Sequence, residues 1–209
     1  MQTIFLHGLG QGPDSWEQTV DALGVDALCP DLFAPFSKGK PTTYATIYDA
    51  FAAYCETLTP PFHLCGLSLG AIVAMHYALD HPDRTASLVL IAGQYRTAKS
   101  LVIMQNILFR LLSASSLRGM GLKKKELIKL TNSVSKLNFS RRLGEITCPT
   151  LLLCGEKDQA NRKASEQMVL KIPNASLQWI PGAGHVVNYE APAALAASMK
   201  AFYGSFVRE

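Results

Sequence analysis

The sequence lacks the features of exported and membrane-spanning proteins. Residues 1–6 already have a strand-like pattern, without the basic stretch and small-residue cleavage site of a signal peptide. No apolar run reaches the roughly 18–20 residues that a spanning helix needs. The five cysteines are odd in number, and no two of them lie two residues apart, so neither a disulfide framework nor a zinc site is indicated. We therefore expect a cytoplasmic protein with reduced thiols, no membrane span, no metal and no other cofactor.

Charge is also scarce, and its positive part is concentrated in one segment. Charged residues make up 17% of the 209 residues and apolar ones 48%, which is typical of a globular domain. The net charge is +4, but residues 118–142 contain eight Lys or Arg and a single acid, Glu126, so the rest of the chain is net negative. Without a broad basic face or a recognisable module, binding to nucleic acid is not expected. A small-molecule substrate is the expected partner.

Apolar runs and helix-like patterns alternate along most of the chain. Strands without polar alternation, separated by helices, are typical of an α/β protein whose parallel sheet is covered on both faces. Ser15, with Gln18 three residues later, predicts a capping box that opens a helix through Leu23, and Thr43 is predicted to cap another helix. The predicted strands are 2–6, 27–29, 62–65, 87–92, 149–155 and 176–180. The other predicted helices are 71–80, 101–112, 122–137, 161–172 and 192–206.

The stretch 62–75 has the pattern of a nucleophile elbow. A short apolar strand runs into Gly66-Leu67-Ser68-Leu69-Gly70, and an apolar helix follows. Glycines flank the serine because strand and helix pass so close that a Cβ would collide. The alternative is an ordinary turn whose serine caps a helix.

Two further polar residues follow predicted strands, and together with Ser68 they suggest a catalytic triad. Asp158 comes after the strand 149–155, and His185 comes after the strand 176–180. The carboxyl ends of parallel strands share one edge of a sheet, where ligands bind. A serine hydroxyl needs a base to take its proton, a histidine titrates near neutrality, and an aspartate orients the imidazole. The order Ser, Asp, His predicts that these residues act as nucleophile, acid and base.

The loop His7-Gly8-Leu9-Gly10 follows the first strand but lacks the spacing of a dinucleotide- or nucleotide-binding loop. Its backbone N–H groups better suit an oxyanion hole. We interpret His7 as a hydrogen-bonded structural residue and Asp31 as structural too, holding the loop near His7. The remaining histidines, His63, His76 and His81, are expected to be structural.

These motifs together resemble those of the α/β-hydrolase superfamily, in its branch of small capped esterases and lactonases. The resemblance covers nearly the whole chain in the expected order. It implies that Ser68 is the nucleophile, His185 the base and Asp158 its orienting acid, with the N–H groups of Leu9 and Leu69 as the oxyanion hole. The matching pieces are 7–10, Pro30-Asp31, 66–70, His81-Pro82-Asp83-Arg84, Gly155-Glu156-Lys157-Asp158 and Gly184-His185.

The chain departs from this pattern in two places. It begins at what the family counts as its third strand, so we expect the first two strands to be missing and about six to remain. Residues 94–144 hold helix-like stretches and no strand, and we interpret them as a small helical cap inserted between the core segments 1–93 and 145–209; the alternative is two ordinary flanking helices. The exposed sheet edge or the cap offers a surface for a homodimer.

The composition of the predicted cap suggests what the pocket accepts. Residues 101–112 are almost wholly apolar, so the roof should suit an acyl or aromatic group, and we assign substrate contacts to Tyr95, Met104 and Leu108. The basic stretch after residue 121 would attract an anionic substrate by steering, unless it is only a solvated lysine face.

The predicted function is that of a serine hydrolase of the carboxylesterase type. It would cleave an ester, lactone or thioester bond of a small, largely apolar substrate through an acyl-enzyme. Two alternatives use the same three residues: a carbon–carbon bond hydrolase or lyase, and a small-molecule receptor with very slow turnover.

Overall fold

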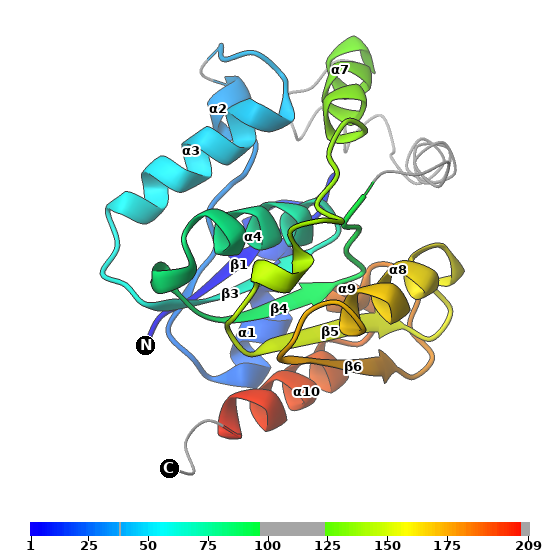
Figure 1. Ribbon diagram of the computed structural model, residues 1–209. Coiled ribbons are helices and arrows are strands. Elements are labelled where there is room, and N and C mark those ends of the chain that lie inside the picture. Colours follow the sequence, from blue (N-terminus) through cyan, green and yellow to red (C-terminus); the bar gives the residue numbers. More distant parts are fainter. Residues whose placement is uncertain (38, 97–123, 206–209) are drawn as a thin grey trace.

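Six parallel strands form one sheet through the middle of the protein (Figure 1). The computed structural model describes residues 1–37, 39–96 and 124–205. The strand order is β2-β1-β3-β4-β5-β6, and every neighbouring pair is parallel. Each predicted strand is confirmed, with its ends moved by at most two residues. The strands are β1 (Thr3–Leu6), β2 (Ala27–Leu28), β3 (Phe62–Leu67), β4 (Thr85–Ile91), β5 (Thr150–Gly155) and β6 (Ala175–Ile180).

Helices connect the strands, because parallel neighbours can be joined only by a crossover. Helix α3 (Tyr44–Glu56) begins after Thr43, whose hydroxyl accepts a hydrogen bond from the Thr46 N–H at 3.3 Å, so the predicted cap is confirmed. The other α-helices are α1 (Glu17–Leu23), α2 (Ala34–Ser37), α4 (Leu69–Asp80), α7 (Lys124–Val134), α8 (Gln159–Val169), α9 (Val187–Glu190) and α10 (Pro192–Gly204). Among the described residues, the 3-10 turns are η1 (Pro13–Trp16), η2 (Pro82–Arg84) and η3 (Leu143–Glu145).

The capping box predicted at Ser15 is wrong. Ser15 lies inside η1, and its hydroxyl donates to the Gly12 carbonyl at 2.6 Å instead of accepting from the next turn. Helix α1 begins after Trp16, without a side-chain cap. Pro13 starts η1, so Ser15 lies within this turn and is not the residue that precedes α1.

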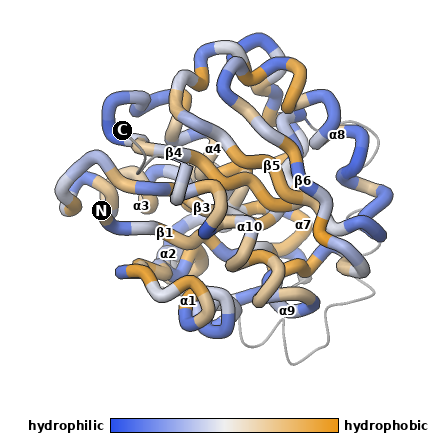
Figure 2. Tube along the Cα trace, turned by 90° about the horizontal axis from the view of Figure 1, so that it is seen from below, coloured by the Kyte–Doolittle hydropathy of each residue, from blue (hydrophilic) through white to orange (hydrophobic). Residues whose placement is uncertain are grey.

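The sheet separates two apolar cores, because successive side chains of a strand point to opposite faces. Helices α3, α4, α7 and α8 cover one face, and α1, α9 and α10 cover the other (Figure 1). Hydrophobic residues gather in β3, β4 and β5, whereas α8 is largely hydrophilic on its outer side (Figure 2). Each fully buried leucine contributes roughly 1.5–3 kcal/mol. Leu64, Leu88 and Leu152 belong to the first core, and Cys65, Val89 and Leu153 to the second.

Helix α7 occupies the second half of the segment predicted as a cap. Its apolar residues Leu127, Leu130 and Val134 are buried, whereas Lys125 and Lys129 are exposed, so the helix is amphipathic. Ser133 accepts a hydrogen bond from the Tyr44 N–H at 2.8 Å, which ties α7 to the start of α3. The helix predicted over 101–112 lies outside the described residues.

All five cysteines are unpaired. Cys55, Cys65 and Cys154 are buried, whereas Cys29 and Cys148 are partly exposed. No helix among the described residues combines the length and the apolar character needed to cross a bilayer.

Candidate active site

Ser68 stands on a strained turn between β3 and α4. Its backbone has φ 54° and ψ −108°, outside the regions that residues with a Cβ usually adopt. A Cβ at Gly66 would lie 2.3 Å from the Gly70 carbonyl oxygen, and one at Gly70 would lie 2.0 Å from the Leu6 carbonyl oxygen. Both positions therefore require glycine, as the sequence pattern predicted. Such strain costs on the order of 1–3 kcal/mol and is maintained only where the surroundings enforce it.

The neighbouring strands hold this turn in place and leave the hydroxyl of Ser68 available. The Ser68 N–H donates to the Ile91 carbonyl at 2.8 Å, and its carbonyl accepts from the Ile72 N–H at 3.1 Å. Within the described part of the chain, the Ser68 hydroxyl has no hydrogen-bond partner, although the residue is only 9% exposed. A largely buried hydroxyl without a partner, at the N-terminus of a helix, is well placed to react with a bound molecule.

Asp158 and His185 form a close pair at the ends of β5 and β6. Nδ1 of His185 lies 2.8 Å from Oδ2 of Asp158. Since the ionised carboxylate can only accept, Nδ1 donates, which leaves Nε2 as the acceptor of a neutral ring. Within the described residues, Nε2 has no hydrogen-bond partner, and the side chain of His185 is 27% exposed. The pair thus presents a free base at the carboxyl edge of the sheet.

The environment of Asp158 favours its ionised form. Burial alone would raise the pKa of Asp158, but the hydrogen bond and charge of His185, together with hydrogen bonds from Asn161, hold this pKa below its usual value. Asp158 also caps α8 by accepting from the Asn161 N–H at 3.3 Å. A carboxylate that stays charged can both orient the imidazole and stabilise its protonated form.

Two contacts outside the predicted triad shape the loop that carries His185. The Glu190 carboxylate accepts from the Gly184 N–H at 2.6 Å and from the Val186 N–H at 3.3 Å, one on each side of the histidine. A Cβ at Gly155 would lie 2.0 Å from the Gly184 carbonyl oxygen, so glycine lets this loop pack on the end of β5. Sequence reasoning missed Glu190; its only signal was an acid five residues after the candidate base.

The predicted oxyanion-hole donors are the backbone N–H groups of Leu9 and Leu69. Neither N–H donates to an acceptor within the described residues. The loop of Leu9 is fixed by Gln11, whose Oε1 accepts from the Gly8 N–H at 3.0 Å and whose Nε2 donates to Oδ1 of Asn188 at 3.0 Å. Asn188 in turn donates to the Ser15 carbonyl at 3.0 Å. Sequence reasoning missed both amides, because the two positions are 177 residues apart.

His7 has the structural role that the sequence suggested. It is fully buried, its Nδ1 donates to the Gly8 carbonyl at 3.0 Å, and its Nε2 accepts from the Leu32 N–H at 3.0 Å. Asp31 lies beside it, 3.5 Å from Nε2. His63 and His76 likewise contact core residues, Ser87 at 2.8 Å and Tyr44 at 3.0 Å.

Of the three residues predicted to touch substrate, Tyr95 is the one that the structure describes. The Tyr95 side chain is buried, and its hydroxyl donates to Oε1 of Gln167 on α8 at 2.7 Å. Met104 and Leu108 lie outside the described residues. Their substrate contacts stay predictions.

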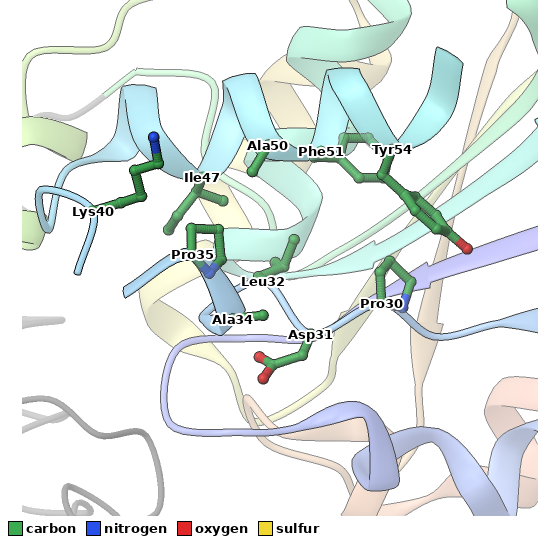
Figure 3. Close-up of a pocket in the computed structure, with 10 residues that line it drawn as sticks. All are labelled: Pro30, Asp31, Leu32, Ala34, Pro35, Lys40, Ile47, Ala50, Phe51 and Tyr54. Atoms are coloured by element: carbon green, nitrogen blue, oxygen red, sulfur yellow. The ribbon is translucent and has the colours of Figure 1, made fainter. Parts of the chain in front are cut away.

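A separate cavity of about 440 Å³ lies between residues 30–40 and α3. Its walls are mostly apolar, with Leu32 and Pro35 facing Ile47 across the gap and Asp31 and Lys40 at the periphery (Figure 3). Neither Ser68, Asp158 nor His185 lines it, so it is distinct from the candidate active site. Within the described residues, no cluster of three or more His, Cys, Asp or Glu side chains is arranged to hold a metal ion.

Comparison with known proteins identifies the family. The sequence profile of the alpha/beta hydrolase family matches residues 3–198. Since this match covers most of the chain, the protein belongs to the alpha/beta hydrolase family, and its sheet and helices are those of that fold.

Sequence identity with individual members of the family is low. The chain is 32% identical over 127 residues to a pimeloyl-[acyl-carrier protein] methyl ester esterase of Vibrio atlanticus, an alignment that covers 54% of this chain and spans about half, 49%, of that relative. It is 22% identical to a putative 2-succinyl-6-hydroxy-2,4-cyclohexadiene-1-carboxylate synthase of Bacillus subtilis, over 90% of this chain and 85% of that protein. A thermophilic esterase from Thermogutta terrifontis superimposes with a TM-score of 0.80 at 22% identity, covering 98% of this chain and 90% of the other.

Proposed function

We propose that this protein is a serine hydrolase that cleaves an ester, thioester or lactone bond of a small, largely apolar substrate. The observation that carries the proposal is the pairing of His185 with Asp158, which leaves Nε2 free at the sheet edge where the strained turn of Ser68 also lies. Membership of the alpha/beta hydrolase family supports it, as does the esterase name of the Vibrio relative.

In the proposed reaction, Ser68 Oγ attacks the substrate carbonyl while Nε2 of His185 takes the hydroxyl proton. Collapse of the tetrahedral intermediate expels an alcohol, which receives that proton, and the acyl group remains on Ser68. Water, deprotonated by the same Nε2, then attacks the acyl-enzyme and releases the acid. The carboxylate of Asp158 holds the ring and stabilises its protonated form throughout.

The N–H groups of Leu9 and Leu69 are the proposed donors to the oxyanion. Both are free of other acceptors in the described structure, and such donors act at ~2.7–3.1 Å from the oxygen. Removing one typically costs about 3–4 kcal/mol of transition-state stabilisation. Because Gln11 and Asn188 hold the loop of Leu9, this donor is fixed before substrate arrives.

We also propose that residues 94–144 form a cap beside the site, inserted into a core made of residues 1–93 and 145–209. Its two ends lie together: Arg96 pairs with Asn138 in an antiparallel bridge, and the Phe139 N–H donates to the Tyr95 carbonyl at 2.7 Å. A segment that leaves and returns at one point is what an insertion requires.

The test is activity and labelling of a Ser68→Ala variant. Wild type should hydrolyse p-nitrophenyl acetate and butyrate, and a fluorophosphonate should modify it once, on the peptide that contains Ser68. The variant should lose both properties and keep its circular dichroism spectrum. Ser135→Ala makes the same change on an exposed residue after α7 and should behave as wild type. Full hydrolysis by Ser68→Ala, or an adduct elsewhere, would overturn the proposal.

A carbon–carbon lyase is the second candidate, and the Bacillus relative favours it because its name describes a synthase. Such a reaction would use the same three residues with a different first step. A substrate panel separates the candidates: activated esters and enol-lactones turn over in an esterase or lactonase, whereas vinylogous diketones do so in a carbon–carbon hydrolase. Labelling of Ser68 with negligible turnover on the whole panel would indicate a receptor.

A further inference from the structure

Two amide side chains stand behind the histidine–aspartate pair. Asn161, in the first turn of α8, is 2% exposed, and its Nδ2 lies 2.7 Å from Oδ2 of Asp158. Gln94, three residues after β4, places its Nε2 2.7 Å from Oδ1 of Asn161. We propose that Asn161, held by Gln94, is a positioning residue that fixes the Asp158 carboxylate and through it the ring of His185. This inference rests on the proposed function.

The orientation of both amides follows from what each atom can do. Asp158, when ionised, can only accept, so the Asn161 atom that faces it must be the NH₂ group. Oδ1 of Asn161 then faces Gln94, which must present its own NH₂ group; that group also lies 3.4 Å from the Ala160 carbonyl. Every contact in the series pairs a donor with an acceptor in only one arrangement, so neither amide can flip without losing a hydrogen bond.

Three donors therefore converge on Asp158. Oδ2 receives Nδ2 of Asn161 at 2.7 Å and Nδ1 of His185 at 2.8 Å, while Oδ1 receives the Asn161 N–H at 3.3 Å. The two donors to Oδ2 lie 3.1 Å apart, as expected when both share one acceptor. The carboxylate cannot rotate without breaking at least one of these bonds, so the direction of its bond to the imidazole is fixed.

Gln94 ties this arrangement to the central strands. The chain reaches it from β4 through Ala92, which has a left-handed φ of 50° and donates its N–H to the Leu153 carbonyl at 2.8 Å. The amide series therefore joins the end of β4 to the acid after β5 and the base after β6. Because this series of hydrogen bonds ends on the carboxylate that contacts His185, it favours a role at the site.

The decisive variant is Asn161→Asp, which keeps the shape of the side chain and replaces its NH₂ donor with a carboxyl oxygen. It places a second carboxylate against Asp158, so the two must share a proton when the pair is buried. We expect kcat to fall 10- to 100-fold at pH 7 with KM changed less than threefold, and the acidic limb of the rate profile to move. Asn174→Asp makes the same change on an exposed residue before β6, and its profile should match wild type.

Gln94 provides the second arm of the experiment. Gln94→Ala should lower kcat less than Asn161→Ala, and the double variant should be no worse than Asn161→Ala alone, because both act through one contact. Asn161→Ser, which keeps a donor, should recover part of the loss. The Cys154 thiol lies 3.8 Å from the Asp158 carbonyl oxygen, but burial raises its pKa to about 11, so it does not account for a change in an acidic limb.

An observation independent of activity separates failure of this inference from failure of the proposed function. Proton NMR should show the hydrogen-bonded Nδ1–H of His185 as a downfield signal, assigned by its absence in His185→Gln. In Asn161→Asp this signal should shift or broaden by exchange, whereas Asn174→Asp should leave it unchanged. An unchanged signal with kcat and pH profile within twofold of wild type would overturn the positioning role, even if Ser68 labels as proposed. Loss of Ser68 labelling in wild type would overturn the function instead.

Discussion

Two histidines each lie beside an aspartate at the carboxyl edge of the same sheet, yet their surroundings differ. His7 follows β1 with Asp31 nearby, and His185 follows β6 with Asp158 nearby. Both ring nitrogens of His7 are used within the protein, and the residue is fully buried. His185 uses one nitrogen, and its side chain is 27% exposed. Of these two histidines, His185 has the nitrogen, Nε2, that makes no hydrogen bond within the described residues, and this fits its proposed role as the base.

The exposure of the two aspartates differs in the opposite sense to that of the histidines. The side chain of Asp31 is 47% exposed and lies 3.5 Å from its histidine, whereas that of Asp158 is 4% exposed and lies 2.8 Å away. Water screens the first carboxylate, so its effect on the ring is small. The second acts in a less polar environment, where a charge-assisted hydrogen bond is stronger. Proximity of a His to an Asp therefore does not by itself identify a catalytic pair.

The strongest test of the difference between the two histidines is to replace each of them in turn. His185→Ala should lower kcat/KM for p-nitrophenyl butyrate by roughly 10⁴- to 10⁶-fold, because no base remains for Ser68. His7→Gln should lower it less than tenfold, since the Gln carbonyl can still accept from the Leu32 N–H. Rates are compared at equal folded fraction, measured by circular dichroism. Equal losses in the two variants would mean that the assignment of the base is wrong.

The aspartates give the next largest effect. Asp158→Asn should lower kcat by about 10³- to 10⁴-fold, because the amide can donate to Nδ1 and so favours the wrong tautomer of His185. Asp31→Asn should change kcat by less than about threefold. Steady-state kinetics at pH 7 and 9 checks both values. Activity of Asp158→Asn near that of wild type would show that His185 is oriented by other contacts.

Much of the fold and of the candidate site could be predicted from the sequence. Apolar runs identified the buried strands β1, β3, β4 and β5, because a strand buried on both faces is mostly apolar. The edge strand β6 was recognised although Ser176 and Gln178 are exposed. Gly-x-Ser-x-Gly identified the elbow, since the close approach of β3 and α4 admits only glycine at Gly66 and Gly70. Asp158 and His185 were predicted as a pair because they lie shortly after β5 and β6, and the carboxyl ends of parallel strands share one edge.

The supporting polar contacts could not be predicted in the same way. Gln94 and Asn161 are 67 residues apart, and Gln11 and Asn188 are 177 apart, so no local spacing relates the members of either pair. Glutamine and asparagine are also common on surfaces, and their burial is visible only in three dimensions. The capping box predicted at Ser15 was wrong for a local reason: a proline two residues before the serine already starts a 3-10 turn.

Replacing the histidines should have a smaller effect on stability than on activity. For stability, His7 should matter more than His185. His7→Phe should lower the free energy of unfolding by about 1–3 kcal/mol, because it leaves the buried Leu32 N–H without its acceptor. His185→Phe should lower it less, since the side chain is partly exposed and the Asp158 carboxylate keeps its hydrogen bonds from Asn161. Urea unfolding followed by circular dichroism gives both values. A larger loss at His185 would indicate that its loop supports the core.

The smallest effect is on how stability depends on pH. The pKa of folded Asp158 is held below its usual value, so this group stays ionised in the folded protein at a pH where the unfolded chain has begun to bind a proton. Its contribution is complete above about pH 5 and is lost as pH falls through the unfolded value near ~3.9 and then the folded one. Asp158→Asn removes that contribution, so its unfolding midpoint should fall less steeply than that of wild type between pH 5 and pH 3. Asp31→Asn, which removes a half-exposed carboxylate, should change the slope less; an equal or greater change there would mean that burial does not distinguish the two pairs.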